Sequence, residues 1–189
     1  MSEAAKAPSN KIFTIPNILS MARIALIPLI VWLYHFKEEY LLSAGVLILS
    51  GVTDVVDGII ARRFGMISNL GKALDPIADK LTQTAMLICL VFKFPLMGIP
   101  LAFMVVKEFV SGIWGLIVIR KTKEVRGAEW HGKAGTVLLY AMMLLHAVWP
   151  NIPTLASNAS IALCTAIMSI SFLLYSTRNY RLMKEIASD

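Results

Sequence analysis

The chain has 189 residues, of which 57% are hydrophobic, and it carries a formal net charge of +6. A mean hydropathy of +0.70 is typical of integral membrane proteins, not of soluble domains, and the length allows a single domain over residues 1–189. The basic residues are spread along the chain, which argues against nucleic acid as a partner. Cys89 and Cys164 lie in apolar runs and predict neither a disulfide framework nor a metal motif.

Six apolar segments follow one another, so the sequence predicts an all-α integral membrane protein built as a bundle of six transmembrane helices. Residues 1–11 are polar and lack the apolar core of a signal peptide, and we expect a flexible tail there. The spans are predicted at about 18–36, 40–62, 74–94, 97–119, 134–148 and 161–175. The fifth is short unless it begins near Trp130, and an earlier start of the sixth, at Leu155, is the alternative to residue 161. Residues 177–189 are expected to form a basic tail.

Lys and Arg are distributed unevenly over the connections between these spans. Thirteen lie in the two tails, in the loop at 62–72 and in the loop at 120–133, whereas the opposite side has Lys37 and Lys93. Cytoplasmic connections of membrane proteins carry the excess of positive charge. Both termini and these two loops are therefore predicted to face the cytoplasm, in a multi-pass protein of the cell membrane.

Four of the five aspartates lie between positions 54 and 79. Asp54 and Asp57 share one helix face and Asp75 and Asp79 are one turn apart on the next helix, so two carboxylate pairs are expected to face a polar cavity on the cytoplasmic side. An ionised aspartate at membrane depth costs roughly 2.5–3.5 kcal/mol and needs a compensating partner. Converging carboxylates favour Mg²⁺, Mn²⁺ or Ca²⁺. The simpler alternative is a set of helix caps and ion pairs with Arg62, Arg63, Lys72 and Lys80.

The aspartates belong to a longer pattern, Asp54-x-x-Asp57-Gly58-x-x-Ala61-Arg62, eight residues, Gly71-x-x-x-Asp75-x-x-x-Asp79. Over these 26 residues the chain resembles, without a gap, the signature of the CDP-alcohol phosphotransferase family. The resemblance implies a membrane enzyme that transfers a phosphatidyl or similar phosphoryl group from a CDP-linked donor such as CDP-diacylglycerol to an alcohol and releases CMP. It also implies a homodimer.

The same resemblance implies roles for individual residues. Two Mg²⁺ or Mn²⁺ ions would be held by Asp54, Asp57, Asp75 and Asp79, and Asp79 would also be the catalytic base. The CDP part of the donor would contact Asp57, Gly58, Ala61, Arg62 and Gly71. Gly58 suits this role because a residue without a side chain lets a nucleotide approach the helix closely.

The small size, the six spans and the segment Ile15-Pro16-Asn17-Ile18 resemble the bacterial phosphatidylglycerophosphate synthases, which use glycerol 3-phosphate as acceptor. Candidate ligands for the acceptor phosphate are basic residues from several segments: Arg23, Lys107, Arg120, His131 and Lys133. Lys133 is a cation at the start of a helix, where the helix dipole disfavours it, which suggests service to an anionic ligand.

Two departures from that group leave other acceptors open. Lys107-Glu108 stands where Arg usually precedes Glu, and Gly132-Lys133-Ala134-Gly135-Thr136 stands where Gly-Lys-x-Lys-Thr is usual. The alternatives are a cardiolipin synthase that uses phosphatidylglycerol, or an inositol- or serine-type phosphatidyltransferase. A cation transporter or channel is the alternative from another class, although it predicts carboxylates spread through the membrane depth.

Four further residues carry expectations of their own. Arg23, inside the first span, either snorkels to the interface or helps to hold a phosphate. Lys107 and Glu108 are neighbours in sequence and are each expected to need a partner elsewhere in the bundle. Pro76 is expected in the first turn of the third helix, where its missing N–H costs nothing.

Overall fold

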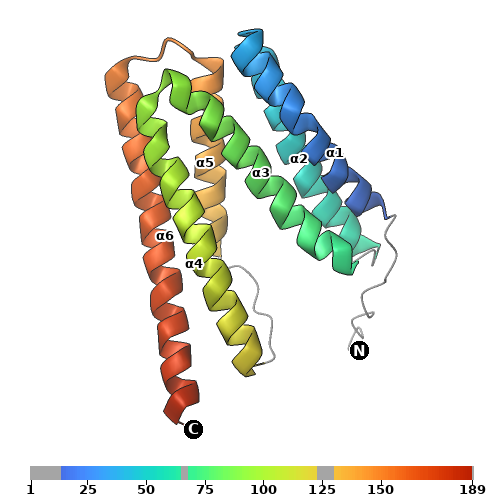
Figure 1. The fold of residues 1–189 in the computed structure, drawn as a ribbon, viewed down its shortest axis with the longest axis vertical. Coiled ribbons are helices and arrows are strands. Elements are labelled where there is room, and N and C mark those ends of the chain that lie inside the picture. The colour runs from blue at the N-terminus through green and yellow to red at the C-terminus, as the bar shows by residue number, and fades with distance from the viewer. Residues whose placement is uncertain (1–13, 65–67, 123–129, 189) are drawn as a thin grey trace. The chain divides into compact units, whose positions relative to one another are not determined.

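The computed structural model describes residues 14–64, 68–122 and 130–188, with the side chains at 62, 69, 72, 115, 116, 118–122, 130–133 and 179–188 outside the description. The predicted all-α class is confirmed (Figure 1). The α-helices of this part are α1 (Ile15–Val31), α2 (Tyr40–Arg63), α3 (Asn69–Lys93), α4 (Gly98–Thr122), α5 (Trp130–Val148) and α6 (Thr154–Ser188). A π-helical segment, η1 (Trp32–Phe36), follows α1, and a 3₁₀ turn, η2 (Pro95–Met97), precedes α4.

Four helical stretches in the described residues are long and apolar enough to cross a membrane, and these are Ile15–Phe36, Tyr40–Ala61, Pro95–Trp114 and Thr154–Arg178. In the most apolar 18 residues of each stretch, between 17% and 28% are buried inside the protein, so most of these residues are at least partly exposed, as residues in contact with lipid are. Ala134–Val148 is a shorter apolar helix. These helices identify a multi-pass membrane protein.

The loop between α2 and α3 is shorter than expected, because α3 begins at Asn69 and not near residue 74. Ser68 accounts for the early start: its hydroxyl accepts a hydrogen bond of 2.9 Å from the backbone N–H of Gly71, as a helix N-cap does. Pro76 consequently lies inside α3, and its expected place in the first turn is wrong. A proline there removes one backbone hydrogen bond close to Asp75.

Helices α5 and α6 also differ from the expected bounds. Helix α5 begins at Trp130, the earlier of the two starts considered. Helix α6 continues to Ser188, so most of the predicted basic tail at 177–189 is helical. That tail has no Gly or Pro and is rich in Arg, Leu, Met, Lys and Glu, which favour helix. The predicted tail at 1–11 lies outside the described residues.

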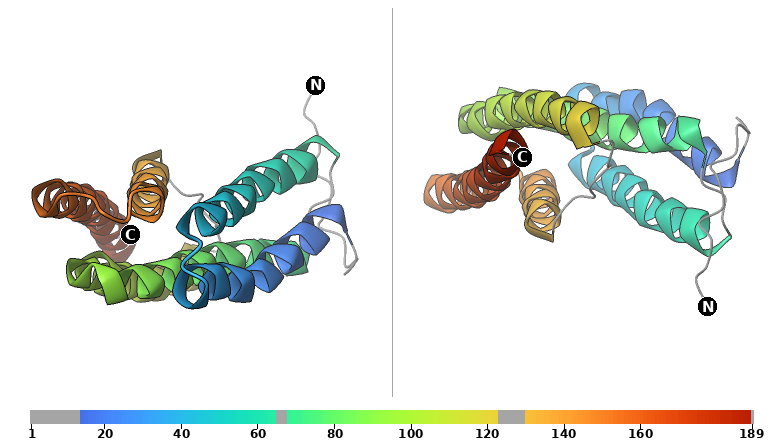
Figure 2. Two further views of the ribbon diagram at one scale, coloured as in Figure 1. Left: turned by 90° about the horizontal axis from the view of Figure 1, so that it is seen from above. Right: turned by 90° about the horizontal axis from the view of Figure 1, so that it is seen from below.

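The chain divides into two compact units, residues 1–89 and 90–189, and each is considered by itself. In the first unit α1 and α2 lie side by side (Figure 2). Their contact is apolar away from the α2–α3 loop, with Ile30, Ala44 and Leu47 buried. Small residues on α2 allow this approach, and the Ser43 hydroxyl donates to the carbonyl of Ile30 at 3.3 Å.

In the second unit α4 and α5 pack on α6. Each of these helices carries a buried methionine: Met104 on α4, Met143 on α5 and Met168 on α6. The buried ring of His146 joins the end of α5 to the start of α6, because its Nε2 lies 2.9 Å from the Ser157 hydroxyl. The cysteines Cys89 and Cys164 are buried and unbridged, as expected.

Candidate active site

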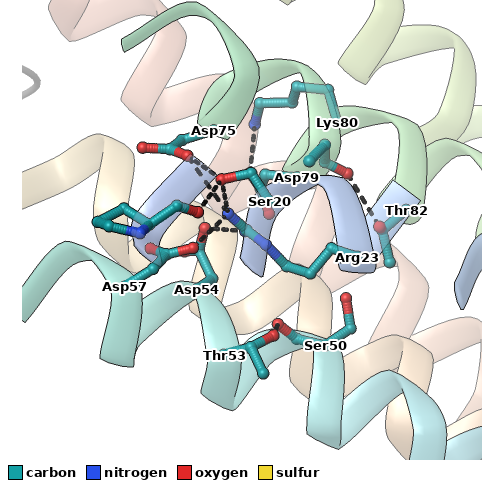
Figure 3. Close-up of polar contacts among 12 residues, drawn as sticks. Ser20, Arg23, Ser50, Thr53, Asp54, Asp57, Asp75, Asp79, Lys80 and Thr82 are labelled. Atoms are coloured by element: carbon teal, nitrogen blue, oxygen red, sulfur yellow. Dashed lines mark hydrogen bonds and ion pairs between the residues drawn. The ribbon is translucent and has the colours of Figure 1, made fainter. Parts of the chain in front are cut away.

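Three aspartates of the first unit gather around one arginine (Figure 3). Arg23 of α1 contacts Asp54 through Nη1, and its Nη2 lies 2.8 Å from Asp57 Oδ2 and 3.7 Å from Asp75 Oδ1. Asp54 and Asp57 come from the last turns of α2, and Asp75 comes from the first half of α3. Asp75 of the second predicted pair therefore faces Asp54 and Asp57 of the first, with a guanidinium between them.

A serine completes this cluster. Ser20, one turn before Arg23 on α1, donates a hydrogen bond from its hydroxyl to Asp75. Arg23 Nη2 lies 3.4 Å from the Ser20 hydroxyl oxygen. The hydroxyl also lies 3.0 Å from the carbonyl of Pro16. Helix α1 thus offers two polar side chains to the aspartates from one face.

Burial differs sharply within the cluster. The side chains of Arg23 and Asp57 are 1% and 2% exposed, whereas those of Asp54 and Asp75 are 40% and 35% exposed. Three carboxylates outnumber one guanidinium, so the ionised cluster carries net negative charge. Its open side, formed by Asp54 and Asp75, is therefore suited to attract a further cation.

Asp79 stands one turn beyond Asp75 on α3 and contacts other groups. Its carboxylate accepts hydrogen bonds from the side-chain amide of Gln83 and lies 3.7 Å from Lys80 Nζ. Of the simple ion pairs considered from the sequence, Asp79 with Lys80 is present among the described side chains, whereas the side chains of Arg62 and Lys72 lie outside the description. Asp54, Asp57 and Asp75 pair with Arg23, which lies on another helix.

The donor set fits a hard divalent cation in its chemistry, since it consists of carboxylate oxygens converging from two helices. Among the residues that the structure describes, no three acidic, His or Cys side chains form a group able to hold one ion. The Arg23 guanidinium lies between the carboxylates and already supplies positive charge there. The expected site for two ions remains a prediction.

Gly71, the glycine near the start of α3, is packed against α1. A Cβ atom at this position would lie 2.5 Å from Asn17 Oδ1 and 3.0 Å from the Ser68 hydroxyl. Asn17 is buried and accepts a hydrogen bond of 2.9 Å from Ser68. We call Asn17, Ser68 and Gly71 the clasp, because they join the start of α1 to the start of α3.

We expect Gly71→Ala to destabilise the protein by about 1–3 kcal/mol, because the added methyl must displace Asn17 or break its bond to Ser68. Thermal unfolding in detergent measures the effect. Gly45→Ala is the matched control: Gly45 lies inside α2, and its Cβ would meet nothing within 4 Å, so alanine there is expected to be neutral or stabilising. Equal stability of the two variants would contradict the clasp.

Comparison with known proteins supplies the family. The model of the CDP-alcohol phosphatidyltransferase family matches residues 13–178. The chain belongs to this family.

Curated relatives cover part of the chain. The CDP-diacylglycerol–glycerol-3-phosphate 3-phosphatidyltransferase of Rickettsia bellii is 37% identical over 110 residues, which is 57% of this chain and 61% of the relative. The cardiolipin synthase (CMP-forming) of Homo sapiens is 38% identical over 109 residues, or 57% of this chain and 36% of that protein. The Streptomyces coelicolor cardiolipin synthase (CMP-forming) is 45% identical over 94 residues, or 47% and 43%. The matches thus span less than two thirds of each relative.

The motif residues expected at the CDP part of the family's donor lie on the two helices that carry the aspartates. Gly58 and Ala61 are partly exposed on the last turns of α2, next to Asp57. The side chain of Arg62 is outside the described residues. Gly71 is buried in the clasp, where its lack of a side chain serves helix packing.

Of the five candidate acceptor residues, two have described side chains, and these belong to different units. Arg23 lies in the aspartate cluster and does not snorkel, because it is buried and paired. Lys107 of α4, in the second unit, pairs at 2.9 Å with Glu108, its neighbour in sequence, although each was expected to need a partner elsewhere in the bundle. Two long side chains that leave adjacent positions are flexible enough to meet. The side chains of Arg120, His131 and Lys133 lie outside the described residues.

Sequence reasoning missed three residues of the site: Asn17, Ser20 and Gln83. The signal for the first two was present, because Asn17, Ser20 and Arg23 recur every third residue in an otherwise apolar helix. Gln83 stands four residues after Asp79, the spacing at which helical side chains meet. A polar residue at membrane depth needs a partner, and positions i±3 and i±4 of its own helix are where the sequence can reveal one.

Proposed function

We propose that the protein transfers the phosphatidyl group of CDP-diacylglycerol to an alcohol and releases CMP. The observation that carries this proposal is the convergence of Asp54, Asp57 and Asp75, three signature residues from α2 and α3, on one partly open cluster. Family membership supports an enzyme over a cation transporter.

In this reaction the acceptor hydroxyl oxygen forms a bond to the phosphorus that bears the diacylglycerol. The diphosphate bond from that phosphorus to CMP breaks, and no covalent enzyme intermediate is needed. Asp79 takes the hydroxyl proton, since an alcohol is a poor nucleophile at neutral pH without a base.

Asp54, Asp57 and Asp75, together with Asp79, would hold Mg²⁺ or Mn²⁺, most simply as two ions. The ions would supply charge neutralisation on the diphosphate and on the departing CMP. Gly58 and Ala61 leave room beside α2 for the nucleotide. The acyl chains of the donor remain in the bilayer, next to the outward-facing apolar residues of α2.

Glycerol 3-phosphate is the proposed acceptor, giving phosphatidylglycerophosphate, and the name of the Rickettsia bellii relative supports it. Lys107, Arg120, His131 and Lys133 are the proposed ligands of its phosphate. Phosphatidylglycerol is the second candidate, because relatives of similar identity are named cardiolipin synthases. The departure at Gly132-Lys133-Ala134-Gly135-Thr136 also favours it, since one cation is missing there.

The test offers purified protein CDP-diacylglycerol, Mg²⁺ or Mn²⁺, and one acceptor at a time: glycerol 3-phosphate, phosphatidylglycerol, inositol phosphate, inositol or serine. CMP release and the lipid product are measured, with Asp75→Asn as the control lacking one signature carboxylate. We expect release with glycerol 3-phosphate. Release with phosphatidylglycerol alone would select the second candidate, and no release with any acceptor would contradict the proposal.

We further propose six spans, a polar cavity on the cytoplasmic side, both termini in the cytoplasm, and a homodimer as in the family resemblance. The thirteen-to-two distribution of basic residues supports this orientation. The α2–α3 loop would then face the cytoplasm together with the aspartate cluster.

Single-cysteine labelling tests the orientation in a background without Cys89 and Cys164. Ser68 is buried, so we choose Phe64, which is 65% exposed in the same loop. Phe64→Cys is expected to react with a membrane-impermeant reagent from the cytoplasmic side only. The control is Leu155→Cys, which is 83% exposed near the start of α6 and should react from the opposite side. Reversed labelling of the pair would overturn the orientation.

A further inference from the structure

Gln83 of α3 holds both oxygens of the Asp79 carboxylate. Its Nε2 lies 2.8 Å from Oδ1 and 2.9 Å from Oδ2. The orientation of the amide follows from chemistry, because a carboxylate only accepts hydrogen bonds and must therefore face the nitrogen. The amide oxygen then faces Lys80 Nζ, a donor, at 3.4 Å. Both ends of the amide are thus used within one helical turn.

Gln83 is an exception on its helix face. It is fully buried, whereas the other buried positions of α3 toward its C-terminal end are mostly apolar, such as Met86, Leu87 and Leu90. A buried amide costs free energy unless its hydrogen bonds are made, and an apolar side chain would fill the same space without that cost. Packing alone therefore does not account for a glutamine here.

The spacing makes the contact rigid. Asp79 and Gln83 are four residues apart on one helix, so their backbones are fixed relative to each other, and the burial of Gln83 limits its rotamers. A donor equidistant from both oxygens fixes the direction in which the carboxylate points. The lone pairs of the Asp79 oxygens that do not face Gln83 are then held toward one region of the site.

We propose that Gln83 is a positioning residue that orients the Asp79 carboxylate toward the acceptor hydroxyl. The inference rests on the proposed function, in which Asp79 is the base. A base held at the correct angle reacts faster than one that rotates freely, and loss of alignment costs roughly a hundred-fold in rate when a reacting group shifts by about 1 Å.

The test is Gln83→Met, which keeps the length and most of the volume and removes the N–H donor. We expect kcat to fall by roughly ten- to a hundred-fold, while KM for CDP-diacylglycerol, direct binding of CDP-diacylglycerol and the thermal unfolding midpoint stay close to the parent. Thr82→Val is the matched control, since Thr82 is a buried polar neighbour whose hydroxyl donates to the Ala78 carbonyl at 2.9 Å. It should keep the parental kcat.

A second variant protects the test against misfolding. Gln83→Asn keeps an amide but is one methylene shorter, so its nitrogen no longer reaches both oxygens, and kcat should fall as in Gln83→Met. If either folded variant keeps the parental kcat, or if binding of CDP-diacylglycerol weakens as much as kcat falls, Gln83 does not act through the orientation of Asp79.

A double variant separates this inference from the proposed function. If Gln83 acts through Asp79, Gln83→Met should not slow Asp79→Asn any further, because the group that it orients is already lost. Additive losses would overturn the positioning role and leave Asp79 as base. Parental activity of Asp79→Asn alone would overturn the proposed base, and the role of Gln83 with it.

Discussion

Asp79→Asn is expected to lower kcat by roughly 10²–10⁴-fold, because the amide cannot take the proton of the acceptor hydroxyl. Binding of CDP-diacylglycerol should persist, since Asp54, Asp57 and Asp75 form their cluster with Arg23 without Asp79. The measurements are CMP release and donor binding across a titration of Mg²⁺ or Mn²⁺.

Asp57→Asn is the matched comparison in the same titration. An amide oxygen is a poorer ligand for a hard cation than a carboxylate, so part of the lost activity should return as the metal concentration rises. No such recovery is expected for Asp79→Asn. Full recovery of Asp79→Asn with added metal would make Asp79 one more ligand and not the base.

Arg23→Met is expected to destabilise the first unit strongly. It leaves the buried Asp57 carboxylate without its partner, and removal of one member of a buried ion pair costs about 3–5 kcal/mol. Arg23→Lys should recover only part of the lost stability. The lysine restores the positive charge, but an ammonium is a point charge and does not match three carboxylates as a planar guanidinium does. Thermal unfolding in detergent measures both variants.

Arg63→Met is the control for Arg23→Met, since Arg63 is an exposed arginine at the end of α2. Its change in stability is expected to stay within about 0.5 kcal/mol. Mg²⁺ should raise the stability of Arg23→Met more than that of the parent, because a cation bound to the folded state replaces the missing charge. Parental stability of Arg23→Met would show that Arg23 does not compensate the aspartates.

The helices and the meeting of Asp54 and Asp57 with Asp75 were predictable, because apolar length and residue spacing along one helix follow directly from sequence. Their partner, Arg23, was not predictable. Spacing within α1 places Arg23 on a face but does not reveal which helix covers that face. The early start of α3 was missed because the cap, Ser68, lies among basic residues that were interpreted as a loop.

Asp79 illustrates the same limit at a smaller scale. Its spacing from Asp75 suggested one shared metal site, yet a helix turns enough in four residues for the two side chains to find different neighbours, Arg23 for Asp75 and Gln83 for Asp79. Lys107 and Glu108 differ from the expectation for another reason. Their side chains are long enough to meet, although adjacent positions on a helix point in different directions.

The ion pairs of Arg23 also bear on how the chain enters the bilayer during synthesis. Helix α1 leaves the ribosome first with an unpaired guanidinium, and its first partner, Asp54, follows 31 residues later on α2. A lone arginine and a lone aspartate are each costly in lipid, and the cost falls when the two are paired. Helices α1 and α2 should therefore insert together as a hairpin, with α3 joining once Asp75 has been made.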